Sequence, residues 1–579
     1  MPRQRSFGWI QDAGDIFKLR SIAEIFVVNS LIHQRLINDL IPQLIPQHLG
    51  RDTFLFELTH EPIEIPYAHL KGKGPQRGET RSNASCSGIA QAVLPAQNGR
   101  AYSSDWATES YVRFAVSLGI IDYDNETDLC KITETGLRLV NTERGSEEEK
   151  KTLGDILLMY PPACRVLQLL RDNGSVPMSK FAIGQQLGFI GEKGFSSYPE
   201  YLISEAIYFA DPQEKSRIKS DVEGTSDKYS RMICGWLKQL GWVSKCDFDV
   251  TVNNGINNIG TVSMIGYRIT LQGVQALNRS LGSSSHPKIP KLVKFEMLAT
   301  AESNSKLLRL RRAHIIDKLS NQNISLLELE DALEYYGCWA DSSVLKDDIN
   351  GLMNIGLNIK MQDDKYKIED IIVGLSIPEE EGSEERGADD NISSIKNELR
   401  LRLHSVNHKY LSLIDYAFDS SSNLLFELNT IDLLNKELGF NAIHLGHSNR
   451  PDGILTLNNH GIIIDNKSYS QGFSIPANQR REMKDYIDQN SQRNPAINST
   501  RWWENFPQTN TSFSYLFVSS FFCGQFIESM NILSTQTNTN GASISARSLL
   551  LLAEQIKCES INNQSLITLF TSNNEIFIE

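Results

Sequence analysis

Residues 451–467 read PDGILTLNNHGIIIDNK, and this stretch decides the fold of the C-terminal part of the chain. The run Gly461–Ile464 is apolar and predicts a short strand that is buried on both faces. Such a strand ordinarily ends in a turn, whereas this one continues into an acid, a spacer and a lysine. Side chains two apart on a strand point the same way, so we expect Asp465 and Lys467 on one side. Asp452, thirteen residues before Asp465, supplies a second acid.

Two carboxylates and an amine at the end of a buried strand favour phosphoryl chemistry. Asp452 and Asp465 are candidate ligands for a hard divalent cation such as Mg²⁺, which keeps several waters and takes other ligands from phosphate. Such an ion offsets charge on a scissile phosphate and activates a water molecule. Lys467 would orient or deprotonate that water, while the spacer Asn466 faces the other way. The pattern alone leaves another interpretation open, because Pro-Asp-Gly is also a common turn signal.

The residues around this pattern resemble a known family. The C-terminal matches are His444-Leu445-Gly446, Arg450-Pro451-Asp452-Gly453, Ile464-Asp465-Asn466-Lys467, Tyr469-Ser470, Glu482-Met483, Tyr486, Trp502-Trp503 and Asn540-Gly541-Ala542. Matches earlier in the chain are Phe7-Gly8-Trp9, Tyr160-Pro161-Pro162-Ala163, Ser226-Asp227-Lys228-Tyr229 and Arg231-Met232. Over essentially its whole length the chain is similar to the FokI-like type IIS restriction endonucleases, members of the PD-(D/E)xK nuclease superfamily.

The resemblance implies a multidomain α+β protein. Winged-helix domains of the helix-turn-helix type would read DNA, followed by an α/β PD-(D/E)xK nuclease domain with a central mixed sheet. The implied parts are recognition domains 1–148 and 149–284, a winged-helix-like structural or interaction domain 285–375, an acidic linker 376–394 and a cleavage domain 395–579.

The implied activity is Mg²⁺-dependent cleavage of double-stranded DNA at a fixed distance outside a short asymmetric site similar to GGATG. The family also implies a monomer that dimerises through its cleavage domain on DNA, a companion DNA methyltransferase and a bacterial cytoplasm.

An internal repeat supports a binding half that is built for DNA. Residues 118–136 and 240–273 each read as a helix end, a glycine cap, a strand, a turn, a second strand and a closing helix. A fainter copy without the closing helix covers residues 355–368. This order is typical of a winged helix, whose preceding helix can enter the major groove.

Composition and charge narrow the class of protein further. With 8 Cys and no CxxC pair in 579 residues, neither a zinc site nor a disulfide framework is expected. No apolar stretch of about 18 residues occurs, so we expect no membrane span. The net charge of -13 is uneven, because residues 251–320 carry ten basic against three acidic side chains. We expect phosphate contacts, or otherwise a solvated helix face, from a basic stripe there. Its members are Lys288, Lys291, Lys294, Lys306, Arg309, Arg311 and Arg312. The acidic linker contains seven acids and one Arg in residues 378–390 and should be an extended tether.

Candidate base-reading residues come from the resemblance alone. Gln11, Arg81 and Trp106 match contact positions of the first domain, and Glu223, Lys228 and Arg231 match those of the second. Basic side chains can pair with guanine, Gln with adenine, and Glu with cytosine. For each residue an ordinary surface role is the alternative. Asp12 and Ser220 stand where the family has asparagine, which puts contacts at those two positions in question.

Residues 478–489 predict an amphipathic helix that matches the family's dimerisation helix. There an acid and an arginine lie four residues apart, and here their order is reversed as Arg481 and Asp485. A two-fold interface tolerates this reversal, because Arg481 of one copy can meet Asp485 of the other. The alternative is an ordinary ion pair within one helix.

Two other functions stay open. One is a strand-specific nicking endonuclease of the same architecture, and the other is a DNA-binding regulator with an inactive nuclease fold. Glu427, on a helix expected before the motif, is a possible outer carboxylate, although a solvated side chain is the favoured interpretation.

Overall fold

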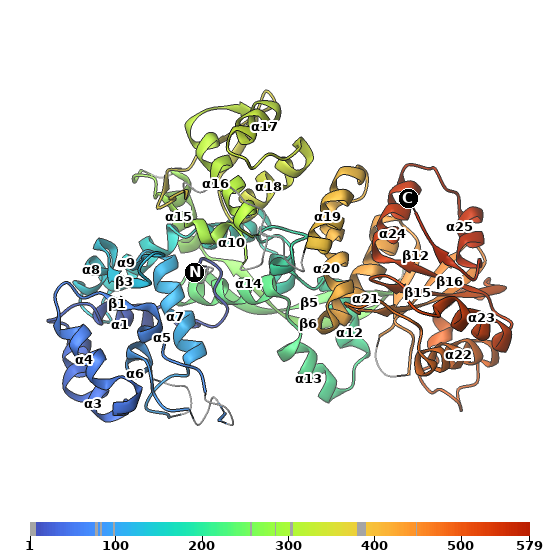
Figure 1. Cartoon of the computed structure of the whole chain (residues 1–579), viewed down its shortest axis with the longest axis horizontal. Helices are drawn as coiled ribbons and strands as arrows, with labels where there is room; N and C mark the ends of the chain where they lie inside the picture. The colour runs from blue at the N-terminus through green and yellow to red at the C-terminus, as the bar shows by residue number, and fades with distance from the viewer. Residues whose placement is uncertain are drawn as a thin grey trace. The chain divides into compact units, whose positions relative to one another are not determined.

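The computed structural model describes residues 7–75, 79–80, 84–95, 99–254, 257–283, 285–300, 305–378, 390–446 and 449–578. The chain groups into two compact units, whose elements are labelled in Figure 1. The first contains Met1–Phe189, Thr225–Phe248 and Ile265–Glu385. The second contains Ile190–Gly224, Asp249–Met264 and Arg386–Glu579. Among the described helices, none has the length and apolarity needed to span a bilayer.

The N-terminal part of the chain is mainly helical. Its helices are α1 Lys18–Glu24, α2 Leu31–Arg35, α3 Ile41–Leu44, α4 Arg51–Thr59, α5 Tyr67–Lys71, α6 Ile89–Val93, α7 Asp105–Ser117, α8 Glu134–Val140, α9 Glu147–Leu158, α10 Pro161–Asp172, α11 Lys180–Gly184, α12 Glu200–Phe209, α13 Pro212–Asp221, α14 Thr225–Gln239, α15 Leu271–Leu281, α16 Ser305–Asn321, α17 Leu326–Tyr335 and α18 Ser342–Asn354. Its strands are β1 Ile65–Pro66, β2 Ile121–Tyr123, β3 Leu129–Ile132, β4 Met178–Ser179, β5 Val243–Asn254, β6 Asn257–Ile269, β7 Lys291–Leu292, β8 Ile324–Ser325, β9 Ile359–Gln362, β10 Lys365–Ile368 and β11 Ile372–Val373.

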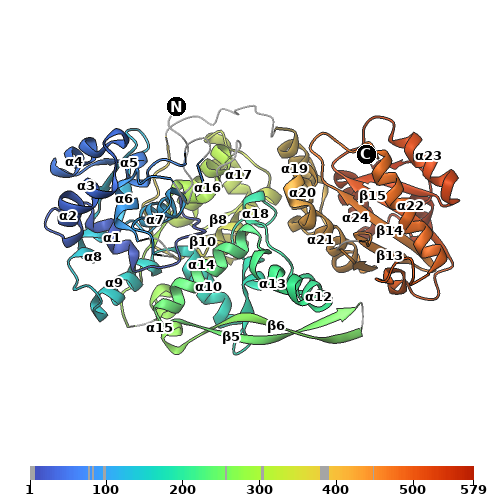
Figure 2. The same ribbon diagram turned by 90° about the horizontal axis from the view of Figure 1, so that it is seen from below.

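The expected winged-helix order occurs three times. A short strand pairs with the second strand of a hairpin in each of the sheets β1-β3-β2, β4-β6-β5 and β8-β10-β9. The second hairpin is the longest, and Figure 2 shows β5 and β6 as an extended two-stranded ribbon. As the sequence predicts, a closing helix follows in the first two copies, as α8 and α15.

Matching residues build the first two copies. Gly119 and Gly241 adopt φ values of 65° and 79° at the ends of α7 and α14, a conformation that glycine adopts without strain. Thr133 then caps α8 by accepting a hydrogen bond from the Gly136 N–H, and Thr270 caps α15 in the same way. A Cβ on Gly136 would lie 2.2 Å from the Ile120 carbonyl oxygen, so this close approach of strand and helix needs glycine. The repeated Ile-Thr-x-x-Gly sequence therefore has one structural cause.

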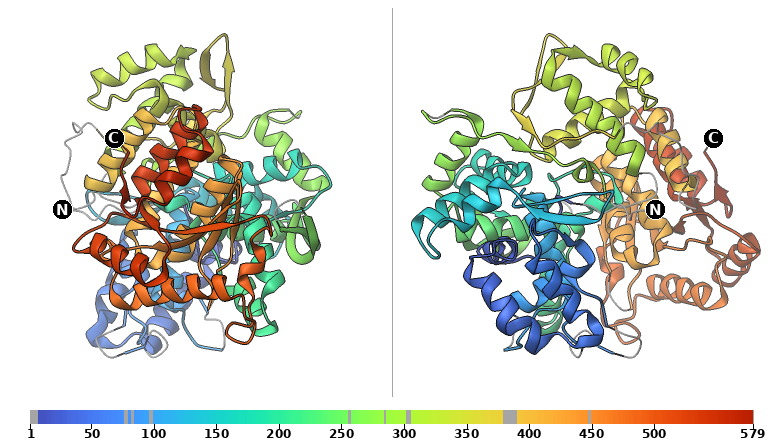
Figure 3. Two further views of the ribbon diagram at one scale, coloured as in Figure 1. Left: turned by 90° about the vertical axis from the view of Figure 1, so that its right-hand side faces the viewer. Right: turned by 60° about the vertical axis from the view of Figure 1, so that its left-hand side comes forward.

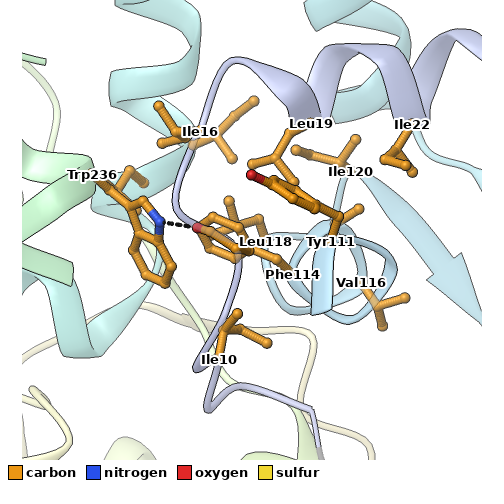
Figure 4. Packing of buried hydrophobic residues seen from close by; sticks show 14 of the residues in the cluster. Ile10, Ile16, Leu19, Ile22, Tyr111, Phe114, Val116, Leu118, Ile120 and Trp236 are labelled. Atoms are coloured by element: carbon orange, nitrogen blue, oxygen red, sulfur yellow. Dashed lines mark hydrogen bonds between the residues drawn. The ribbon is translucent and has the colours of Figure 1, made fainter. Parts of the chain in front are cut away.

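The core of the first unit joins these modules. Trp236 of α14 is fully buried, stacks on Phe114 of α7 at 4.0 Å between ring centroids, and donates its indole N–H to the Ala13 carbonyl at 2.5 Å (Figure 4). Ile16 and Leu19 pack into the same cluster. Burial of large aromatic side chains dominates the stability of such an interface.

The second unit contains a six-stranded mixed sheet of order β12-β13-β14-β15-β16-β17. Strands β12, β13 and β14 pair in antiparallel orientation, and β14, β15, β16 and β17 pair in parallel orientation. The strands are β12 Asn441–His444, β13 Gly453–Leu457, β14 His460–Lys467, β15 Ser512–Ser519, β16 Gly541–Ser545 and β17 Glu575–Ile576. The helices are α19 Asp390–Arg402, α20 Ser412–Phe418, α21 Asn423–Asp432, α22 Ala477–Gln492, α23 Phe526–Thr537, α24 Ala546–Lys557 and α25 Asn563–Phe570.

Helices cover both faces of this sheet, as parallel strands require (Figure 3). Ile462 and Ile464 of β14 pack in one cluster with residues of α20, α21, α24 and α25. Ile463 packs in the other with residues of α22 and α23. The central mixed sheet predicted for this region is therefore confirmed.

The domain boundaries expected from the sequence remain a prediction. The unit that carries the mixed sheet also includes Ile190–Gly224, which falls inside the expected domain 149–284. In it, the Tyr201 hydroxyl donates to Asp432, and Lys436 lies 4.7 Å from the centre of the Tyr201 ring. Residues 379–389 of the expected linker lie outside the described residues, and α19 begins at Asp390.

Candidate active site

Strand register brings the two predicted acids together. Gly453 of β13 pairs with Ile464 of β14 in antiparallel register, so Asp452, immediately before β13, stands opposite Asp465. Side chains alternate along β14, and Ile463 faces α22. Asp465 and Lys467 therefore project to the α22 side, as their spacing predicts.

Direct contacts hold the three side chains. Lys467 donates from Nζ to Asp465 Oδ1 at 2.9 Å, and the backbone N–H of Asn466 donates to Asp452 Oδ2 at 2.6 Å. The Asn466 side chain points to the opposite face, where its Nδ2 donates to Thr430 Oγ1 of α21 at 2.7 Å. The sequence predicts this orientation of the spacer.

The electrostatics of the site are those of crowded, desolvated carboxyl groups. Burial, followed by the charges of Glu427 and Asp465, raises the pKa of Asp452 well above its usual range. Burial also raises the pKa of Asp465 to about 6, against the opposing effect of Lys467. Burial alone would lower the pKa of Lys467, but the adjacent Asp465 and Asp452 raise it instead. The site therefore disfavours two ionised acids unless further positive charge is present.

These residues fit a hard divalent cation. Asp465 Oδ2 is buried and has no hydrogen-bond partner in the described part of the chain, so one carboxylate oxygen remains for a ligand. Within the described ranges no three His, Cys, Asp or Glu side chains form a complete metal cage. Two carboxylates with the remaining positions filled by water and phosphate is the coordination that Mg²⁺ adopts in phosphoryl-transfer sites.

Two further acids lie near the pair. Glu427 of α21 contacts His444 of β12 at 3.3 Å, and its side chain is only 18% exposed. The interpretation of Glu427 as a solvated residue is therefore wrong, because α21 packs against β12 and its Glu427 carboxylate acts on Asp452. Glu482 of α22 acts electrostatically on both Asp465 and Lys467. Sequence reasoning assigned Glu482 no role, although its spacing from Tyr486 on an amphipathic helix was the available signal.

The candidate DNA contacts of the first module lie partly on one surface. Trp106 is 49% exposed and donates from Nε1 to Asp12 Oδ2 at 2.5 Å. The neighbouring Gln11 hydrogen-bonds to Tyr229. Arg81 lies outside the described residues. Asp12, which replaces the asparagine of the family, therefore accepts a hydrogen bond from Trp106, itself a candidate DNA contact.

The second set of candidate contacts flanks α14. Glu223 immediately precedes this helix, and Lys228 and Arg231 lie one turn apart near its start. All three are half-buried, while Asp227 and Ser230 between them are fully buried. Because α14 precedes the β5–β6 hairpin, it has the position of the groove-binding helix in a winged helix.

The basic stripe predicted to contact phosphate is instead largely structural. Arg311 and Arg312 are buried and donate to the two carboxylate oxygens of Asp348 at 2.6 and 2.8 Å. Arg309 is buried and donates to the carbonyls of Ala299 and Thr300. Buried charges need an opposite charge or hydrogen-bond acceptors, and these three arginines have them.

The lysines of the stripe are also engaged. Lys291 is 1% exposed and donates to the Leu158 carbonyl at 3.0 Å. Lys288 pairs with Asp370, and Lys294 with Asp122. Lys306 is half-buried and has an interaction of its own. The phosphate-binding prediction is wrong for the buried members, because a local excess of charge does not reveal the carboxylates and carbonyls that these side chains bond in the folded protein.

The expected dimerisation helix is present as α22. Arg481 and Asp485 are both exposed on it. Arg481 donates to the Ala477 carbonyl at 3.3 Å, and no ion pair joins it to Asp485 within the described chain. On the same helix Lys484 does pair with Asp488. Both predicted interface residues thus face outward, and their role in dimerisation stays a prediction.

Comparisons with known proteins cover nearly the whole chain. Family models match residues 5–142 (FokI, recognition domain, subdomain 1), 149–285 (FokI, recognition domain, subdomain 2), 298–364 (FokI, D3 domain) and 389–577 (FokI, cleavage domain). The type II restriction enzyme FokI of Planomicrobium okeanokoites is 34% identical over 99% of both chains. The type II restriction enzyme StsI of Streptococcus sanguinis is 31% identical over 96% of this chain and 94% of its own.

Comparison with solved structures also matches this chain to FokI. The structure of restriction endonuclease FokI matches with a TM-score of 0.89, and FokI bound to DNA matches with 0.91. In both cases the identity is 33%, and the match covers 99% of this chain and 100% of the solved one.

Proposed function

This chain belongs to the FokI family of type II restriction enzymes, and from that premise we propose that Asp452, Asp465 and Lys467 form its Mg²⁺-dependent centre for DNA hydrolysis. The protein is a type IIS, site-specific deoxyribonuclease. The observation that supports this centre is the 2.9 Å contact of Lys467 with Asp465 at the end of β14, with Asp452 held opposite.

Each residue has a distinct role in the proposed reaction. When bound, Mg²⁺ supplies Lewis-acid stabilisation of phosphate charge and a more acidic water. Asp452 and Asp465 would hold the ion, and the Asn466 amide keeps Asp452 in place. Lys467 orients the attacking water and offsets charge on the phosphate. The water oxygen bonds to phosphorus and releases one proton to solvent, the bond from phosphorus to the leaving sugar oxygen breaks, and that oxygen takes a proton from solvent.

The N-terminal modules would select the site on double-stranded DNA. Gln11, Trp106 and Arg81 are the proposed contacts of the first module. Those of the second are Glu223, Lys228 and Arg231. The match to DNA-bound FokI over 99% of this chain supports binding of DNA. From the resemblance to that family we infer a short asymmetric site similar to GGATG, with cleavage at a fixed distance outside it.

Double-strand cleavage would need two copies. Each chain has one such centre and would cut one strand, so a pair of cleavage domains must meet on DNA. Arg481 and Asp485 on the exposed side of α22 are the proposed contact. A companion methyltransferase and a bacterial cytoplasm complete the proposed setting.

Replacing one acid tests the proposal. Asp452→Ala should keep specific DNA binding in Ca²⁺ and lose cleavage in Mg²⁺, whereas Glu504→Gln, in an exposed ion pair with Arg501, should behave as wild type. Run-off sequencing of cut plasmid reads the site and the offset on each strand. Accumulation of open circles without linear product would favour the nicking enzyme. Full cleavage by Asp452→Ala would refute the assigned centre.

A further inference from the structure

Helix α22 has two faces with different surroundings. Arg481 and Asp485 are exposed, whereas Met483 and Tyr486 are buried in the cluster that also contains Ile463 of β14. Glu482 is half-buried between these faces. Since Ile463 and Asp465 project to the same side of the strand, the inner face of α22 covers the side of the sheet that carries the catalytic residues.

A hydrogen bond fixes the Glu482 side chain. The Tyr486 hydroxyl, one helical turn later, donates to Glu482 Oε1 at 3.1 Å. Tyr486 is 6% exposed and packs edge-on against Trp502, with 6.1 Å between ring centroids. Trp502 is held in turn by its Nε1 hydrogen bond to Gln489 Oε1 at 2.8 Å. The Glu482 carboxylate is therefore hydrogen-bonded to a buried aromatic residue that is itself packed against Trp502.

Glu482 lies on the helix that packs over the proposed centre. Its neighbours Met483 and Tyr486 are buried in one cluster with Ile463, which lies two residues before Asp465 on β14. The described contacts show no direct ion pair between Glu482 and Lys467, which instead pairs with Asp465. Packing thus places Glu482 on the element that covers Asp465 and Lys467, without an ion pair to Lys467 among the described residues.

We propose that Glu482, held by Tyr486, is a positioning residue of the nuclease centre. The Glu482 carboxylate accepts hydrogen bonds from water molecules around the cation. This inference rests on the proposed role of Asp452 and Asp465 as cation ligands. Partners beyond the direct ligands orient what the ligands hold, and their loss typically costs about 10- to 100-fold in metal affinity or activity. Arg481 and Asp485 are exposed on the same helix as Glu482. A dimer contact at these two residues would therefore act on α22, the helix that also carries the positioning residue Glu482.

The test compares three full-length variants with wild type. Glu482→Gln keeps size and removes charge, Tyr486→Phe removes only the hydroxyl, and Asp488→Asn changes a solvent-facing acid of the same helix as a matched control. Mn²⁺ affinity is measured by electron paramagnetic resonance titration, and the half-saturating Mg²⁺ concentration by single-turnover cleavage. Melting temperature and DNA affinity in Ca²⁺ report on folding and recognition.

We expect Glu482→Gln to weaken Mn²⁺ binding and raise the half-saturating Mg²⁺ concentration about 10-fold or more. Tyr486→Phe should shift both in the same direction by less, and Glu482→Asp should recover part of the loss. Asp488→Asn should change neither. Wild-type cation dependence in Glu482→Gln, with a wild-type melting temperature, would overturn the inference. Should Glu482→Gln fold poorly, unchanged cation dependence in Tyr486→Phe and Glu482→Asp would overturn it equally.

Asp465→Ala separates this inference from the proposed function. If Asp465→Ala still cleaves, the assigned centre itself is wrong. If Asp465→Ala is inactive while Glu482→Gln matches wild type, only the positioning role fails.

Discussion

The backbone N–H of Asn466 donates to Asp452 Oδ2 at 2.6 Å and thereby joins the two halves of the proposed catalytic motif across neighbouring strands. The antiparallel register of β13 and β14 makes this contact possible, because Gly453 is opposite Ile464. The spacer therefore serves the site through its backbone, while its side chain bonds Thr430 on the other face of the sheet.

Asn466→Ala should leave the chemistry almost unchanged. The substitution keeps the backbone N–H and removes only the bond to Thr430, which should cost about 1 kcal/mol of stability. Lys467→Met, one residue later, should lower the single-turnover rate by about 100-fold or more. Rapid-quench cleavage and urea unfolding measure the two effects. A comparable loss of rate in both variants would contradict this division of roles.

Asp452→Asn should stabilise the protein in the absence of divalent cations at pH 8. A raised pKa means that folded Asp452 keeps its proton above pH 4, near which an unfolded aspartic acid releases it. The folded state then binds more protons than the unfolded state, so the free energy of unfolding falls as pH rises through that window. The amide avoids this cost.

Calorimetry of both proteins checks the sign. The higher melting temperature of Asp452→Asn should disappear near pH 4. Added Mg²⁺ should reduce it at pH 8, because only wild type keeps both ligands. A variant that melts lower than wild type at pH 8 without cations would show that the site is not strained by its acids.

Charge complementarity at α22 can be tested with single variants. Arg481→Asp and Asp485→Arg should each lower linear product from one-site plasmid, because two-fold symmetry then places like charges together. A mixture of the two variants should recover cleavage, since each supplies the charge that the other lacks. Lys484→Gln is the control on the same helix. Mixed dimers with a FokI cleavage domain should likewise be disfavoured, and equal cleavage by mixed and homogeneous pairs would refute that expectation.

Asp348→Ala should destabilise the first unit by about 3–5 kcal/mol, because it leaves two arginines buried without their partner. Lys288→Gln, at a lysine paired with Asp370, should leave the salt dependence of DNA binding unchanged. Urea unfolding and binding titrations at several salt concentrations measure these effects. A reduced salt slope in Lys288→Gln would restore a phosphate-binding role for that lysine.

Much of the fold and part of the site could be predicted from local pattern. The apolar run before Asp465 indicated a buried strand, and a spacing of two placed Asp465 and Lys467 on one side because strand side chains alternate. Gly119 and Gly241 indicated where two helices end, because few other residues adopt a positive φ easily. The strand, turn and second strand that follow each glycine indicated the winged-helix order.

Other features depended on residues far apart in the chain. Lys291 donates to the carbonyl of Leu158, and Arg312 pairs with Asp348, so charges that suggested a DNA-binding surface are buried and hydrogen-bonded inside the protein. Glu482 and Glu427 come from helices on opposite faces of the sheet, and no short motif links either to Asp465.

The sequence by itself determined the family, through matching residues along the whole chain. It also determined the strand that carries the proposed catalytic pair and the direction of its side chains, since these follow from spacing over a few residues. Only the tertiary structure decided which charges are buried and which acids surround the centre. The physical reason is that the cost of burying a charge depends on the partners that packing brings close to it. Those partners lie on elements far apart in the chain, and their positions in the sequence do not reveal that they will meet.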